Sequence, residues 1–112
     1  MPNSCKKGKR GEVEAAEKMS AALGIELRRS KQSRGSEEAD LEGLKGVHCE
    51  VKRVEAFHLW VALQQAKDDC KPGDVPVVLH RKNRTPWVLV VEVDRLVELV
   101  DKLNAILLES EL

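Results

Sequence analysis

Two acidic side chains and a lysine occur within a short stretch in the middle of this 112-residue sequence. Asp40 ends the segment Ser-Glu-Glu-Ala-Asp, and Glu50 and Lys52 follow in Val-His-Cys-Glu-Val-Lys-Arg-Val. The second segment alternates polar and apolar residues as a strand does, so Glu50 and Lys52 should point to the same face. Two carboxylates and a lysine gathered at one place can hold a divalent metal beside a phosphodiester. This is the chemistry of a small metal-dependent nuclease.

Hard oxygen ligands are what such a metal requires, and Mg²⁺ is the expected ion, with Mn²⁺ able to substitute. Asp40 and Glu50 would supply carboxylate oxygens, and the carbonyl of Val51 would supply another. Lys52 could orient the attacking water, help to deprotonate it, or stabilise the pentavalent phosphorus. The sequence does not separate these three roles.

A further carboxylate is available on the first predicted helix, which carries Glu12, Glu14 and Glu17. Positions 12 and 14 differ by about 200° around a helix, so they cannot both face one site. Glu12 stands at the start of the helix, where it could reach a metal at the edge of a sheet.

An isolated Asp…Glu-x-Lys pattern has low specificity in a chain of which 34% is charged. An alternating polar strand face is also often just the solvated side of a sheet. The surrounding sequence must therefore distinguish a nuclease site from a solvated strand face.

Length and composition favour one aliphatic-cored domain with reduced thiols. The chain has 42% hydrophobic residues, few aromatics and three widely spaced cysteines without a Cys-x-x-Cys pair, which makes a disulfide framework or a zinc site unexpected. We find no apolar run of membrane-spanning length and no signal-peptide pattern. We therefore expect a cytoplasmic protein with no membrane partner and no organic cofactor.

The net charge of zero combines a basic and an acidic end. Residues 1–35 hold nine Lys and Arg against four Glu, residues 76–91 hold three basic residues and no acid, and residues 92–112 hold six acids against two bases. The basic parts could bind phosphate groups, although a solvated basic tail is an equally good interpretation of residues 6–10.

Periodicity and turn residues predict the order α-β-β-β-α-β-β-α. Helices are expected at residues 11–23, 57–70 and 95–108, strands at 25–29, 47–54, 75–80 and 87–93, and a brief strand or turn at 40–43. The strand at 47–54 should face the core with Val47, Cys49 and Val51. The apolar stripe of the second helix should consist of Leu59, Trp60, Leu63, Ala66 and Cys70. Residues 1–8 should be a flexible basic arm and residues 9–112 one domain. The order predicts an α/β fold with helices flanking a mixed central sheet.

With these elements in order, the chain resembles the PD-(D/E)XK nuclease superfamily, and more narrowly the small Holliday-junction resolvases of archaea and phages. The motifs that carry the resemblance are Lys7-Gly8-Lys9-Arg10-Gly11-Glu12, Ala39-Asp40, Glu50-Val51-Lys52, the segment 60–66, and the segment 77–87 with His80-Arg81-Lys82-Asn83-Arg84. The resemblance favours Glu12 over Glu14. It implies a restriction-endonuclease-like core, with Glu12, Asp40 and Glu50 as metal ligands and Lys52 as a catalytic residue.

The resemblance also implies a homodimer acting on branched double-stranded DNA in recombination or repair, in the host cytoplasm if the chain is phage-encoded. The expected DNA contacts are Lys7, Lys9, Arg10, Lys31, Ser33, Arg34, Gln65, Arg81, Lys82 and Arg84. Ser30 and Ser36 are alternatives to Ser33 for the serine that resolvases carry before the aspartate, and Gln64 is an alternative to Gln65. His48 is expected to be a surface histidine.

Two other functions fit the same sequence. One is a nuclease of this fold that acts on flaps, ends or plain duplex DNA. The other is a nuclease-fold DNA-binding module without catalysis, against which the complete set of Asp40, Glu50 and Lys52 argues.

Overall fold

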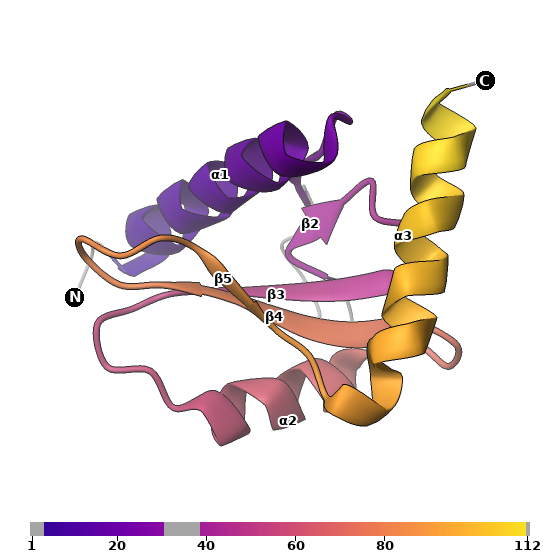
Figure 1. Ribbon diagram of the computed structural model, residues 1–112. Helices are drawn as coiled ribbons and strands as arrows, with labels where there is room; N and C mark the ends of the chain where they lie inside the picture. Colours follow the sequence, from indigo (N-terminus) through magenta and orange to yellow (C-terminus); the bar gives the residue numbers. More distant parts are fainter. Residues whose placement is uncertain (1–3, 31–38, 112) are drawn as a thin grey trace.

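The computed structural model describes residues 4–30 and 39–111, with side chains from residue 8 onward. Its elements are α1 (Ser4–Leu23), β1 (Arg28–Arg29), β2 (Leu41–Glu42), β3 (Val47–Arg53), α2 (Leu59–Asp69), β4 (Val75–Arg81), β5 (Val88–Val90), the 3-10 turn η1 (Val93–Arg95) and α3 (Leu96–Ser110). Figure 1 shows their arrangement. The α/β class is confirmed.

The main sheet is mixed and has the strand order β3-β4-β5. β3 and β4 run parallel from the pair Val47–Val75 to the pair Arg53–Arg81, and β5 returns antiparallel beside the second half of β4. Pro76 is tolerated in β4 although it has no N–H to donate. The N–H of Val75 points to the β3 side, where it donates to the Gly46 carbonyl, so the backbone nitrogen of Pro76 points to the opposite side. On that side β5 has already ended, so no hydrogen bond is lost. A separate ribbon pairs β1 with β2.

Helices cover both faces of the main sheet (Figure 1). One face packs against α1 and α3 through an aliphatic core that includes Ala16, Cys49, Val77 and Leu99. The other face packs against Ala62, Leu63 and Ala66 of α2, which surround Val78. β4 is therefore buried on both faces, as its continuous apolar run predicts.

The sequence predictions differ from the structure at three places. α1 begins at Ser4 and not at residue 11, so residues 4–8 are helical; Lys and Arg in this segment are good helix formers, and the helix passes through Gly8. β5 has three residues and is an edge strand of the main sheet, where Val88 and Leu89 are exposed. Trp60, expected in the apolar stripe of α2, is 76% exposed because Ala62, Leu63 and Ala66 make the contact with the sheet.

Within the described ranges, no helix combines the length and the apolar character needed to cross a bilayer.

Two glycines of α1 provide a matched test of how closely this helix approaches β3. A Cβ added at Gly11 would lie 2.7 Å from Arg53 Cβ, whereas a Cβ at Gly8 would meet nothing within 4 Å. Gly8→Ala should therefore raise the free energy of unfolding by about 0.5–1 kcal/mol through helix propensity. Gly11→Ala should lower it by about 1–3 kcal/mol, because a Cβ cannot rotate out of the clash.

Chemical denaturation of the two variants beside the wild type measures both effects. Equal stabilisation by the two alanines would show that α1 does not approach β3 closely at Gly11.

Candidate active site

Asp40 is held between the β1–β2 ribbon and the free edge of β3. Its backbone N–H donates to the Cys49 carbonyl at 2.9 Å, and its carbonyl accepts the Ser30 N–H at 2.8 Å. Its side-chain Oδ2 accepts the Val51 N–H at 2.7 Å. The carbonyl of Val51 points to the same edge as its N–H, because both groups of a strand residue face the same neighbour. The Asp40 carboxylate and the Val51 carbonyl thus share one edge of β3.

Glu50 and Lys52 both lie on the α2 side of β3, as the alternation predicts. Glu50 is 5% exposed, and its Oε1 lies 3.0 Å from Nε2 of His48. Lys52 Nζ donates to Gln65 Oε1 at 3.0 Å, which links the strand to α2. Glu50 is therefore fixed inside the protein, whereas Lys52 lies nearer the surface.

The two acidic residues of α1 have different surroundings. Glu14 Oε1 accepts hydrogen bonds from Arg81 and from Trp87 Nε1 (3.1 Å) and lies 3.6 Å from Arg53 Nε. Glu14 thus ties the helix to the ends of β3 and β4. Glu12 instead accepts a hydrogen bond from Arg29 Nε at 3.1 Å, on the side of α1 that faces Asp40.

The charges acting on Asp40 come from the other three members of the predicted set. The pKa of this carboxyl is raised to about 7, with burial as the largest cause and the carboxylates of Glu50 and Glu12 acting in the same direction. The hydrogen bond from Val51 and the charge of Lys52 act in the opposite direction. The structure therefore brings Glu12, Asp40, Glu50 and Lys52 within electrostatic reach of one another.

The oxygen atoms near Asp40 are of the kind that a hard cation such as Mg²⁺ prefers. Asp40, Glu50 and the Val51 carbonyl offer oxygen atoms, and a cation beside them would relieve the repulsion between carboxylates. Across residues 4–30 and 39–111, no three Asp, Glu, His or Cys side chains converge on one point as they stand. The contacts explain this: Arg29 holds Glu12 and His48 holds Glu50, so a third carboxylate would join only after Glu12 leaves Arg29.

Apart from Gln65, which accepts a hydrogen bond from Lys52, the expected DNA contacts fall into three groups. Lys9 and Arg10 on α1 and Lys82 and Arg84 at the β4–β5 turn are exposed, and Arg84 adopts a left-handed backbone conformation with φ of 64°. Arg81 is engaged by Glu14 and donates from Nε to the Thr85 carbonyl, so it holds the turn together. Lys31, Ser33 and Arg34, and the side chain of Lys7, lie outside the described residues.

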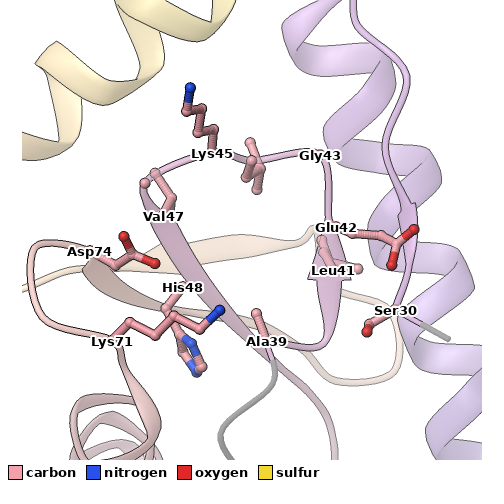
Figure 2. A pocket seen from close by; sticks show the side chains of 12 residues that line it. Ser30, Ala39, Leu41, Glu42, Gly43, Lys45, Val47, His48, Lys71 and Asp74 are labelled. Atoms are coloured by element: carbon pink, nitrogen blue, oxygen red, sulfur yellow. The ribbon is translucent and has the colours of Figure 1, made fainter. Parts of the chain in front are cut away.

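A cavity of about 310 Å³ opens near the start of β3. Ala39, His48, Lys71 and Asp74 contribute to its lining (Figure 2), and in this view Lys45 points away from it. Acidic and basic groups are mixed around it, so the cavity indicates no single class of ligand. Its importance here is that His48 reaches both this cavity and Glu50.

Three features of the site were missed by the sequence predictions. His48 is 3% exposed and not a surface histidine, because α2 covers this face of β3. The contact between Arg29 and Glu12 and the role of Glu14 depend on how α1 crosses the sheet. The polar-apolar alternation was the only available signal for His48, because it places this residue on the same face as Glu50.

Comparisons of the chain with protein families, with curated proteins and with solved structures each gave no match.

Asp40 provides a test of this electrostatic arrangement. Because its folded-state pKa is raised, the carboxyl contributes stability below its unfolded-state pKa, about 4, and this contribution is lost as the pH rises through about 7. In EDTA, the free energy of unfolding of the wild type should therefore fall relative to that of Asp40→Asn as the pH rises from 4.5 to 8.5. A pKa raised from about 4 to about 7 corresponds to a change of roughly 2–4 kcal/mol in the free energy of unfolding across this pH range.

Urea denaturation of both proteins across this pH range gives the comparison. Asparagine keeps an oxygen acceptor for the Val51 N–H, so the variant changes mainly the charge. Parallel pH profiles for the two proteins would contradict the arrangement.

Proposed function

We propose that the chain is a member of the PD-(D/E)XK nuclease superfamily and a Mg²⁺-dependent, structure-selective DNA endonuclease of the Holliday-junction resolvase type. The observation that carries the proposal is the environment of Asp40, on which the charges of Glu50, Glu12 and Lys52 all act. A role in DNA binding alone does not require acidic side chains near phosphate. A hydrolytic enzyme needs them to hold a cation.

The proposed chemistry divides among the residues according to their contacts. Asp40, Glu50 and the Val51 carbonyl would hold Mg²⁺, with Glu12 as a further ligand once it leaves Arg29. The bound ion would supply charge neutralisation and a more acidic water. Lys52, positioned by Gln65, would stand beside the attacked phosphate, where its ammonium group can orient the water or stabilise negative charge on phosphorus.

Basic side chains on two elements would position the duplex. Lys9 and Arg10 extend from α1, and Lys82 and Arg84 from the β4–β5 turn. Contacts of this kind bind phosphates and carry no sequence information, which suits an enzyme that selects DNA by shape.

A junction has two-fold pseudo-symmetry, so paired nicks require a C₂ dimer. The surface that best fits a second copy is the apolar stripe of η1 and α3, defined here as Val93, Leu96, Val97, Val100 and Leu108, all of them exposed. Trp60 and Val61 on α2 are exposed as well, but this helix also carries Gln65, the partner of Lys52. Pairing through the stripe on α3 leaves the proposed catalytic face open to DNA.

Removing either central carboxylate tests the proposed site. Asp40→Ala and Glu50→Ala should each lower the cleavage rate of a four-way junction in Mg²⁺ by at least about 100-fold, since charge stabilisation of this kind supplies factors of that order. Junction binding measured in EDTA should survive, because the proposed phosphate contacts lie elsewhere.

Glu42→Ala is the matched control, since Glu42 is an exposed acid two residues after Asp40. Cleavage at the wild-type rate by both Asp40→Ala and Glu50→Ala would rule out this site. Cleavage of flaps or linear duplex at rates equal to those on a junction would favour a nuclease of broader structure preference.

The dimer surface has its own test. Val97 is 73% exposed, so Val97→Glu should not unfold the monomer but should place a charge in the proposed interface. Sedimentation should show a dimeric wild type and a dissociation constant raised by at least about tenfold in the variant. The control is Val61→Glu on α2, which should stay dimeric. A monomeric wild type, or dissociation by Val61→Glu alone, would overturn the choice of α3.

A further inference from the structure

We propose that His48 is a positioning residue that holds Glu50 in its metal-binding orientation. The inference rests on the proposed function, since it assigns Glu50 to the cation. His48 was expected at the surface, yet it lies in the interior, where it contacts Glu50 and contributes to the lining of the cavity of Figure 2.

Burial makes the contact between the two side chains necessary. His48 is 3% exposed and Glu50 is 5% exposed, so both polar groups have been withdrawn from water. A buried carboxylate is costly unless a donor satisfies it. His48 Nε2 is 3.0 Å from Glu50 Oε1 and meets this requirement.

The geometry of the pair also has a directional consequence. With Glu50 ionised, its carboxylate can only accept, so Nε2 must carry a hydrogen and donate a hydrogen bond to Oε1. A bond to one carboxylate oxygen fixes the rotamer of the side chain and directs the second oxygen elsewhere. The histidine and the glutamate are two residues apart on one strand, so β3 itself keeps their side chains on the same face.

The same strand presents the rest of the site. Val51 follows Glu50 and donates its N–H to Asp40 Oδ2 at the edge of β3. The charge of Glu50 acts on Asp40, so rotation of Glu50 away from its present orientation would change the spacing between these two proposed metal ligands. Hydrogen bonds to a ligating side chain of this kind are worth about 10–100-fold in metal affinity.

The test compares variants that keep or lose the donor. His48→Gln retains a side-chain N–H near the position of Nε2, and His48→Leu removes it while preserving bulk. His58→Gln is the control, because His58 is an exposed histidine before α2 with no side-chain capping bond. Each protein is titrated with Mg²⁺, with junction cleavage and the Mg²⁺-induced shift in melting temperature as separate readouts.

His48→Leu should raise the half-saturating Mg²⁺ concentration by about 10–100-fold in both readouts. Cleavage should recover as Mg²⁺ is raised, and His48→Gln and His58→Gln should stay near the wild type. A purely structural histidine would lower the melting temperature without moving the Mg²⁺ dependence, and that result overturns the inference.

If His48→Leu does not fold, His48→Gln is compared with His48→Asn, whose shorter side chain does not reach Glu50. Equal Mg²⁺ dependence of these two variants would overturn the inference. If the wild type is stabilised by Mg²⁺ but cuts no DNA, the proposed function fails, while the thermal titration still decides the role of His48. If cleavage occurs and His48→Leu titrates like His58→Gln, only the inference fails. No Mg²⁺-induced shift in the wild type would overturn it as well.

Discussion

The hydrogen bonding of Asp40 is the interaction on which the rest of the structure depends. Its backbone joins Ser30 to the Cys49 carbonyl, and its carboxylate accepts the Val51 N–H. These bonds attach the short β1–β2 ribbon to the open edge of β3, where a free row of backbone groups would otherwise remain. The same bonds hold an acidic side chain beside two other carboxylates. Fold and candidate chemistry therefore share one residue.

Burial of β3 on both faces sets the character of the site. α1 and α3 cover one face, and α2 covers the other, so Glu50 becomes an interior carboxylate that needs His48. The two acids of α1 have different contacts. Glu14 binds Arg53, Arg81 and Trp87 and so attaches the helix to the sheet. Glu12 lies on the side of α1 that faces Asp40. One helix thus fastens the strand ends and contributes to the acidic cluster.

The sequence predicted the parts of this arrangement that depend on local pattern. Alternation in residues 47–52 placed Val47 and Cys49 in the core and Glu50 with Lys52, and the helical angle between positions 12 and 14 required different roles for the two acids. Depth of burial was not predictable, because whether a polar strand face is solvated depends on the packing of a helix. This explains the error at His48, and also at Trp60, where small alanines and not the tryptophan contact the sheet.

The central claim is that this cluster cuts branched DNA with the help of a divalent cation. The most direct measurement is the cleavage pattern of an end-labelled four-way junction incubated with Mg²⁺, beside a linear duplex of the same sequence. The account predicts paired, symmetry-related nicks in opposing strands of the junction and much slower cleavage of the duplex. Failure to cut any branched or linear DNA in either Mg²⁺ or Mn²⁺ would contradict it and would favour a DNA-binding module without catalysis.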